Sequence, residues 1–396
     1  MATQAPARQG APNKNAPAPR PYPFPVGVYE SAVIDYDNSL LQQATPVQFP
    51  IWNLSPTGWL RGLWFDFAMT TSANAAAVAF QDDTGSPAGG FMGIQKVILY
   101  DLGGEVVISV LGYEWLALMK FGGYFEVGDP RSDPQNSRTT GAVGAGGSFH
   151  WAAYLPLEAV RRDSLGVVQN ESKPGWKVEL WMDSSGQTYS TAPTTLGTLR
   201  VRGTIDSYTE PAAAAPNGRP FQQTPPLPGS LQYWKSENQT LPASSAKYDL
   251  TNGIGFPIRN IIYYVRDSAN LTRVTADANW PDPATLLIGN VNYFTRLKNL
   301  WISKMFKEYG FSPAALTQWT VAAADQPQGR ENGVFPVWFT ADLDSHPGDE
   351  ARFKYLDTQV NSLVRLTGSF GGAVTFFALT NWLATPSKNR YSLIGG

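Results

Sequence analysis

One acidic segment near the end of the sequence holds the residues best suited to bind a metal ion. The stretch FTADLDSHPGDEARF contains, within nine positions, Asp342, Asp344, His346, Asp349 and Glu350. Carboxylate oxygens at such spacing can hold Ca²⁺ in a loop, but the twelve-residue pattern of a calcium loop and its turn glycine are not matched here. We therefore interpret the segment as a solvated acidic loop at a strand end, and we expect neither a metal nor a cofactor.

Glycoside hydrolysis would need two carboxyl groups across an aromatic groove. Glu114 and Glu179 lie near Trp-containing segments. Most Trp residues, however, stand within apolar alternation, where core packing explains them better than sugar binding. The sequence also has no nucleophile elbow, phosphate-binding loop or metal-binding helix motif. We therefore predict that the protein is not an enzyme, and keep a β-sandwich polysaccharide hydrolase as a less favoured alternative.

The composition narrows the function further. The net charge is −2 and no long run of Lys or Arg occurs, so we expect no direct nucleic-acid binding. With no Cys and only two His, a disulfide framework and a thiolate zinc site are excluded. No apolar stretch reaches the roughly 20 residues of a membrane span and no signal peptide is evident, so we expect a soluble protein made in the cytoplasm. Charged residues are only 16 %, which favours a surface partly covered by other protein.

Proline-rich segments divide the chain. Residues 1 to 25 contain seven prolines and three cations, Arg8, Lys14 and Arg20; such a segment is extended and becomes ordered on a partner surface. A second break, EPAAAAPNGRPFQQTPPLPG, indicates a linker. We thus predict an arm, a first domain, a linker, a second domain and a tail, over residues 1–25, 26–209, 210–229, 230–384 and 385–396.

Both domains read as β-structure, because apolar segments rich in aromatic and β-branched residues are bounded by turn signals. In SFHWAAYLPL, for example, Phe149, Trp151 and Ala153 fall on one face at period two, as a half-buried strand requires. The predicted strands are residues 26–36, 59–69, 94–101, 104–111, 148–157, 176–183 and 198–208 in the first half, and 256–267, 284–291, 333–343, 361–370 and 373–383 in the second. The fold class is therefore all-β.

Each half also contains one short helix with the same apolar spacing. The segment GYEWLALMKFGG has Trp115 and Met119 four positions apart, and RLKNLWISKMFKEYG has Trp301 and Met305 at the same spacing. The two Trp residues are separated by 301 − 115 = 186 positions. Residues four apart lie on one face of a helix, so each pair is expected to pack inward.

The strands around the helices repeat as well. Phe149 recurs as Phe335, again 186 positions later, and Arg61 recurs as Arg259 at an offset of 198. Chance repetition in an aromatic-rich chain is the alternative, but the preserved order of elements disfavours it. The sequence therefore predicts an internal duplication: two tandem eight-stranded jelly rolls, each with one inserted helix.

Particular stretches resemble a known family. IQKVILYD, SFHWAAYLPLEAV with the spacer that leads to WKVELWMDSS, and LPASSAKYDLTNGIGFPIRNIIYYVRD are similar, in order and spacing, to segments of the tectivirus-like major capsid proteins of the double jelly-roll lineage. The resemblance covers most of residues 26 to 384. These proteins belong to tailless dsDNA phages with a membrane inside an icosahedral shell.

The resemblance implies a coat protein whose homotrimers form pseudo-hexagonal capsomers in the virion capsid, assembled in the host cytoplasm. Its partners would be copies of itself, minor capsid proteins and an internal membrane. The family's N-terminal segment lies on the inner side, so Arg8, Lys14 and Arg20 are candidate contacts to the membrane or to neighbouring capsomers; each would contribute about 1 kcal/mol near anionic lipid. A jelly-roll carbohydrate-binding or receptor-binding protein is the main alternative, with its Trp and Tyr exposed in one patch.

Overall fold

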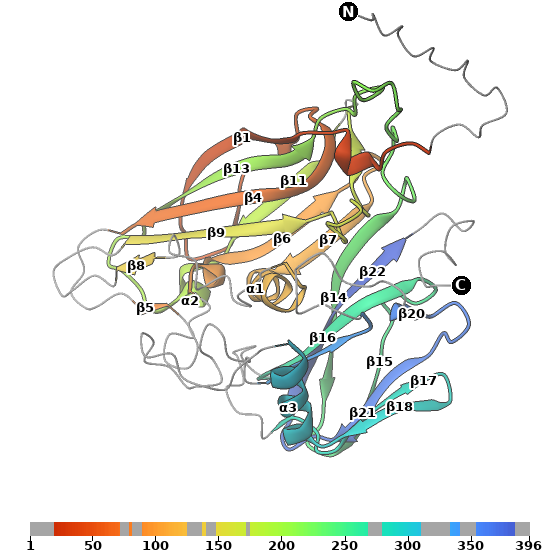
Figure 1. The fold of residues 1–396 in the computed structure, drawn as a ribbon. Helices are drawn as coiled ribbons and strands as arrows, with labels where there is room; N and C mark the ends of the chain where they lie inside the picture. Colours follow the sequence, from red (N-terminus) through yellow and green to blue (C-terminus); the bar gives the residue numbers. More distant parts are fainter. Residues whose placement is uncertain are drawn as a thin grey trace, which may run out of the picture.

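The structure is a computed structural model of the chain. It describes residues 20–71, 79–80, 89–124, 137–139, 148–171, 175–267, 279–309, 333–340 and 354–384. Figure 1 shows two β-rich bodies, one formed by the first half of the chain and the other by the second half.

The first half forms two principal antiparallel sheets, and β5 (Ala79–Phe80) pairs separately with β12 (Tyr189–Thr191). One contains, in spatial order, β1 (Glu30–Leu41), β13 (Thr198–Tyr208), β4 (Gly58–Thr70), β9 (Ser148–Pro156) and β8 (Ser137–Thr139), with β10 (Val168–Asn170) also paired to β4. The other contains β2 (Val47–Gln48) and β3 (Trp52–Asn53), both paired to β11 (Lys177–Met182), followed by β6 (Ile94–Tyr100) and β7 (Val106–Leu111). If β2 and β3 are counted as one broken strand, the principal strands follow the orders 1-8-3-6 and 2-7-4-5, which is the arrangement of a jelly roll.

The second half repeats this arrangement. Its first sheet contains β14 (Leu231–Leu241), β22 (Val374–Ala384), β16 (Pro257–Asp267) and β19 (Val334–Trp338), with β20 (Leu356–Asp357) also paired to β16. Its second sheet contains β15 (Ser245–Asp249), β21 (Val364–Ser369), β17 (Ala284–Ile288) and β18 (Val291–Arg296). The strand orders are again 1-8-3-6 and 2-7-4-5. The predicted double jelly roll is confirmed.

The predicted helices occupy equivalent places. Helix α1 (Gly112–Phe121) and helix α3 (Lys298–Tyr309) each connect the fifth strand of a jelly roll to the sixth. Shorter elements complete the first half: η1 (Phe24–Val26), β5 (Ala79–Phe80), η2 (Gly89–Gly93), α2 (Ser185–Thr188) and β12 (Tyr189–Thr191). The helices differ in surroundings, because every residue of α1 is buried whereas α3 keeps one side exposed.

The core follows the predicted alternation. In β9, Phe149, Trp151, Ala153 and Leu155 are all buried, and the residues between them are less so. Trp115 of α1 packs edge-on against Phe65 with ring centroids 5.0 Å apart. In the second half the ring of Trp301 packs edge-on against that of Phe335, with centroids 5.5 Å apart. Aromatic side chains thus fill the space between the two sheets of each jelly roll.

A β-bulge at one arginine aligns the two halves. Pairing between β4 and β13 skips Arg61, and pairing between β16 and β22 skips Arg259. The carbonyl of Arg61 accepts a hydrogen bond from Leu157 N at 2.9 Å, and that of Arg259 accepts one from Phe339 N at 3.0 Å. The predicted equivalence of Arg61 and Arg259 is therefore confirmed by the backbone.

The predicted equivalence of Phe149 and Phe335 is wrong by four residues. The bulge aligns Leu157 with Phe339, an offset of 339 − 157 = 182. Phe335 is therefore equivalent to Ala153 instead. The segment between helix and sixth strand is thus four residues shorter in the second half. Because side chains alternate at period two, a slip of four leaves the same face buried, and the sequence pattern cannot detect it.

The two jelly rolls are joined through one shared sheet. Strand β14 pairs in parallel with β7, with Trp234 opposite Ile108 and Lys235 opposite Ser109. This pairing connects the first sheet of the second half to the second sheet of the first half in a single ten-stranded sheet. The molecule therefore has a head-to-tail order, with β1 at one end and β18 at the other (Figure 1).

The end of the predicted arm is attached to the first jelly roll. Phe24 is fully buried, with its ring 5.4 Å from that of Trp59 and 6.0 Å from that of Tyr208. Tyr22 contacts the predicted linker, since its ring lies 5.5 Å from that of Phe221. Residues 20 to 26 thus pack at the place where the chain leaves the first jelly roll.

Candidate functional site: the junction between the jelly rolls

Glu114, one of the two acids singled out for hydrolysis, connects the two halves at the start of α1. Its carboxylate is fully buried and accepts hydrogen bonds from Leu111 N at 2.8 Å, from Tyr264 Oη at 2.5 Å and from Ser236 Oγ. Burial raises the pKa of Glu114, and these hydrogen bonds oppose that rise. Because Ser236 lies on β14 and Tyr264 on β16, this carboxyl group fixes the second jelly roll against the helix of the first.

Gln232 forms a second connection. Its side-chain amide is buried on β14 and donates to the carbonyls of Pro156 and Leu157, each at 3.3 Å. The Gln232 oxygen accepts a hydrogen bond from Tyr124 Oη at 2.6 Å. A glutamine can donate and accept at once. The Gln232 side chain therefore satisfies a hydroxyl group just after α1 and two carbonyl groups at the end of β9.

Aromatic groups complete the junction. The indole of Trp338, on β19, donates to the carbonyl of Phe121 at the end of α1, at 2.8 Å. Near the start of the helix, the Arg266 guanidinium lies 4.8 Å from the centre of the Tyr113 ring. Both ends of α1 are therefore held by strands of the second half, which explains the burial of the entire helix.

The bulged arginines have different neighbours in the two halves. Arg61 contacts three carboxylates: Nη1 lies 3.1 Å from Glu30 and 3.4 Å from Asp206, and Nη2 lies 3.0 Å from Glu158. Desolvation raises the pKa of Glu158 to about 7, although Arg61 works against this rise. The cluster lies at the outer end of the first jelly roll, where Glu30 remains 59 % exposed.

Arg259 is fully buried and hydrogen-bonds to two neutral side chains in the described part of the chain. Its Nη1 lies 3.3 Å from the Asn381 side-chain oxygen and 3.4 Å from Tyr124 Oη. Asn381 in turn donates to Gln232 at 3.1 Å. By the register of the strands, Gln232 is equivalent to Glu30 and Asn381 to Asp206. The group around Arg259 is thus the second-half copy of the Arg61 cluster, with two amides in place of two acids.

The predicted arm residues are only partly described. Arg20 is exposed, and its carbonyl accepts a hydrogen bond from Arg219 Nε. The Arg219 guanidinium also lies over the ring of Tyr22, 4.0 Å from its centre. Arg8 and Lys14 lie outside the described residues, as does the acidic loop from Asp342 to Glu350. In the described part of the chain, no three His, Asp or Glu side chains are grouped as metal ligands.

The two acids of the hydrolase hypothesis have separate surroundings. Glu114 is enclosed in the junction, whereas Glu179 lies on β11. Burial raises the pKa of Tyr100, and Glu179 adds to that rise.

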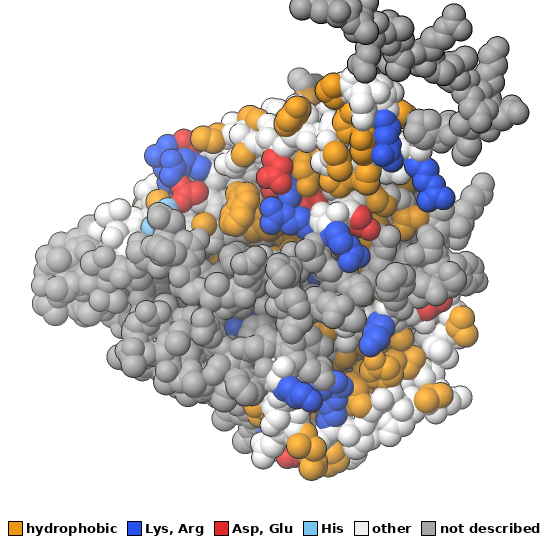
Figure 2. Space-filling view, viewed as in Figure 1, with side chains coloured by type: hydrophobic (Ala, Val, Ile, Leu, Met, Phe, Trp, Pro, Cys, Tyr) orange, Lys and Arg blue, Asp and Glu red, His pale blue; other side chains and the backbone are white. Residues whose placement is uncertain are grey.

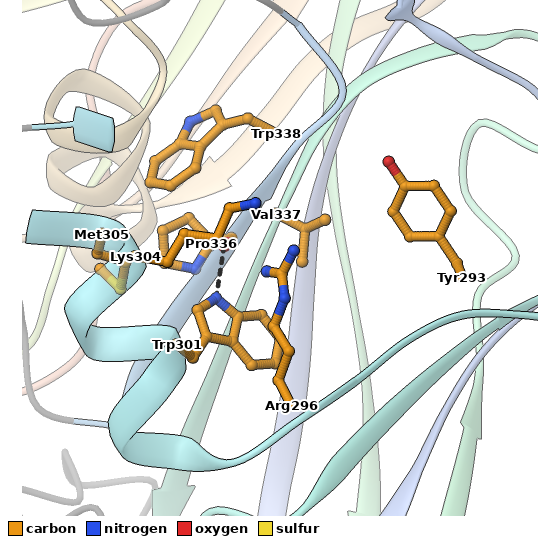
Figure 3. A pocket seen from close by; sticks show the side chains of 8 residues that line it. All are labelled: Tyr293, Arg296, Trp301, Lys304, Met305, Pro336, Val337 and Trp338. Carbon is orange, nitrogen blue, oxygen red and sulfur yellow. Dashed lines mark hydrogen bonds between the residues drawn. The ribbon is translucent and has the colours of Figure 1, made fainter. Parts of the chain in front are cut away.

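A hollow beside α3 has a cavity volume of about 60 Å³ and is lined by residues of β18, α3 and β19, among them Trp301, Lys304 and Trp338 (Figure 3). No acid occurs among the described residues that line it, and ligand sites are typically about 300 Å³ or larger.

Sequence reasoning missed the residues that form the junction. The sequence offers Glu114 only as a candidate catalytic acid, and its pattern predicts no strand at β14, where Gln232 lies. Strand β14 reads LQYWKSENQTL, whose polar second half resembles a loop. The duplication itself is the signal that could have revealed β14, since a first strand is required before the residues equivalent to β4.

None of the helices within the described ranges has the length and apolar character of a transmembrane helix.

Comparisons with known proteins show the fold. No family model and no curated protein matches the sequence. Among solved structures, the chain is similar to the major capsid protein of STIV, the Sulfolobus turreted icosahedral virus, with TM-score 0.58 and 13 % identity over 91 % of this chain and 98 % of that one. The PBCV-1 virus capsid matches with TM-score 0.56 and 12 % identity, over 93 % and 96 % of the two chains. The faustovirus major capsid protein matches with TM-score 0.50 and 7 % identity, over 95 % and 92 %.

Proposed function

We propose that the chain is a major capsid protein, whose homotrimers form pseudo-hexagonal capsomers that assemble into an icosahedral shell. The observation that carries the proposal is the head-to-tail junction of two jelly rolls through β7 and β14. The near full-length likeness to viral capsid proteins of the same architecture supports it.

The duplication has a physical purpose in such a shell. A trimer of two-domain chains presents six similar bodies, so three-fold symmetry can fill a six-fold position of a lattice. Head-to-tail contacts close into a ring when the rotation per copy permits it. The low content of charged residues, 16 %, fits a surface that is largely covered by neighbouring copies.

A finer proposal concerns the kind of virus. The sequence resemblance favours a tectivirus-like tailless phage with a membrane beneath the shell, assembled in the host cytoplasm together with minor capsid proteins. In this proposal the arm carrying Arg8, Lys14 and Arg20 extends from the packed residues 20 to 26 toward the membrane or a neighbouring capsomer. Electrostatic attraction to anionic lipid would supply part of that contact.

The alternative of a carbohydrate-binding or receptor-binding protein has weaker support. That alternative predicts one patch of exposed aromatic residues. Among the described residues, however, the most exposed Tyr side chains lie far apart: Tyr29, near β1, is 78 % exposed, and Tyr293, on β18 at the opposite end of the molecule, is 50 % exposed. Trp64 is 39 % exposed, on a strand rather than a loop.

Electron microscopy of the concentrated, purified protein tests the proposal. We expect hexagon-shaped capsomers, and sheets or closed shells under crowding or in the presence of anionic vesicles. Single compact particles under all these conditions, together with specific binding on a glycan array, would instead support the carbohydrate-binding alternative.

A further inference from the structure

The chain uses one pair of docking faces internally and leaves the matching pair open. Inside the molecule, the fifth strand and helix of the first jelly roll, β7 and α1, contact the first strand of the second, β14. The equivalent elements at the two ends are β18 with α3, and β1. In the described part of the chain, β18 pairs only with β17 and β1 only with β13. The molecule thus ends in two faces that correspond to the two sides of its own junction.

The β18 face can be aligned residue by residue with β7. The helices are related by an offset of 186, and the same offset relates Ile108 to Phe294 and Ser109 to Thr295. A register shift supports this alignment, because it lies just before Ile108 in the pairing of β6 with β7 and just before Phe294 in that of β17 with β18. Phe294 and Thr295 are therefore the counterparts of the two β7 residues that pair with β14.

The β1 face is aligned with β14 through the eighth strands. Ala32 pairs with Asp206, and Trp234 pairs with the equivalent Asn381. Ala32 and Val33 are consequently the counterparts of Trp234 and Lys235, which pair with β7. Both β1 residues are exposed, whereas in β14 Trp234 is fully buried and Lys235 is half-buried.

The side chains at the open faces are apolar where the internal junction is polar. Glu114 and Ser236 hydrogen-bond across the junction, and their counterparts are Leu300 and Ile34. Leu300 is 62 % exposed and Ile34 is 72 % exposed. Two large apolar side chains in matching places on opposite ends are what a contact between copies would bury. Figure 2 shows hydrophobic side chains gathered over the β1 end and again at the opposite end of this view.

The hollow beside α3 lies on the same open face. Two of its lining residues, Arg296 and Lys304, are half-buried. Their first-half counterparts, Val110 and Leu118, are buried apolar side chains. Figure 3 shows Arg296 and Lys304 among the side chains that line the hollow. The hollow therefore lies where the first half has buried apolar side chains, on the face that carries β18 and α3.

We propose that β18 and α3 of one copy dock on β1 of the next copy, with Phe294 and Thr295 opposite Ala32 and Val33. The contact would repeat the β7 and β14 junction between chains, so that each jelly roll in the ring meets its neighbours in the same way. The occupant of each open face is thus a second copy of this chain. The inference rests on the proposed function, since it requires a protein that self-associates.

Crosslinking tests the proposed register directly, because the chain contains no Cys. The double variant Thr295→Cys with Val33→Cys should give covalent oligomers up to the trimer with a short bis-maleimide, read on denaturing gels. A matched control combines Val33→Cys with Val360→Cys, since Val360 is 83 % exposed in the turn after β20. The control and each single variant should remain at the monomer mass.

A second pair of variants keeps the test decisive if the cysteine variants fold poorly. Ile34→Glu and Leu300→Glu change exposed side chains, so each should fold and yet lose the trimer in light scattering, whereas Val360→Glu should retain it. A trimer that neither crosslinks at the predicted pair nor dissociates in these variants would overturn the docking surface and leave the capsid proposal intact. A wild-type protein that stays monomeric would overturn both.

Discussion

Within the described ranges, the bulged arginine of the third strand contacts three acids in one jelly roll and hydrogen-bonds to neutral side chains in the other. The backbone position is the same, as shown by the shared bulge at Arg61 and Arg259. The first-half neighbours are Glu30, Asp206 and Glu158, and the residues at the corresponding second-half positions are Gln232, Asn381 and Thr340.

The location of each cluster explains the difference. The Arg61 cluster lies at the end of the molecule, where water reaches Glu30. The Arg259 cluster lies under the first jelly roll, where Gln232 and Asn381 are fully buried. Buried carboxylates are costly unless every lone pair is satisfied, whereas an amide can donate and accept across an interface. The duplicated fold thus keeps its geometry while its chemistry follows the position of each copy.

Removal of the two arginines should give the largest contrast between the halves. Arg61→Met leaves the buried Glu158 carboxylate without its cation, so at pH 8 we expect a loss of about 3–5 kcal/mol in the free energy of unfolding. Arg259→Met removes the hydrogen bonds to the neutral Asn381 and Tyr124 side chains, and we expect a loss of about 1–3 kcal/mol. Urea denaturation of the two variants measures both values. Equal losses would contradict the assignment of charged and neutral clusters.

The acidity of Glu158 should make the first cluster sensitive to pH. Its pKa is raised to about 7 in the folded protein, so between its ordinary value of about 4.3 and pH 7 the folded state binds more protons than the unfolded state. This carboxyl group therefore lowers stability as the pH rises through that range. Glu158→Gln should flatten this part of the curve of melting temperature against pH. A decline that persists unchanged in the variant would show that other groups cause it.

The helix positions Glu114 and Leu300 provide a more moderate contrast. Glu114→Ala leaves the Tyr264 and Ser236 hydroxyls without their acceptor, and we expect it to cost about 1–3 kcal/mol. Glu114→Gln keeps an acceptor and should cost less. Leu300→Ala changes an exposed side chain and should leave the stability of the isolated chain within about 0.5 kcal/mol. Thermal unfolding of the three variants measures the order, and a larger loss for Leu300→Ala than for Glu114→Ala would contradict it.

The arm should have the smallest effect on stability. Deletion of residues 1 to 19 leaves Tyr22 and Phe24 in place, so we expect an unchanged melting temperature and an intact trimer but impaired shell assembly. Deletion of residues 1 to 24 also removes the buried Phe24 and should lower the melting temperature. Normal shells from the shorter deletion would refute a role of the arm in assembly.

Much of the fold could be predicted because its signals are local. Alternating apolar residues marked most strands, and the paired Trp and Met residues marked both helices, because burial imposes a period on each element. The indoles of Trp115 and Trp301 indeed make the same bond, to the carbonyls of Tyr154 and Pro336 at 2.8 and 3.2 Å. By the register of the sixth strands these two carbonyls are equivalent.

The junction could not be predicted, since it depends on contacts between distant segments. Glu114, Gln232 and Asn381 are residue types that usually lie on the surface, and only the second jelly roll places them in the interior. The sequence pattern does not predict strands β14, β15 and β18, for a related reason. Their exposed or interface positions break the alternation of a strand with one buried face, as the polar residues of β14 and the exposed pattern of β18 show.

The solution mass of the purified protein tests the central claim most directly. Light scattering after size-exclusion chromatography should give a stable species of three times 43.2 kDa, about 130 kDa, because the open β1 and β18 faces are expected to close a ring of three chains. A single species at 43.2 kDa that persists at high concentration would contradict the account.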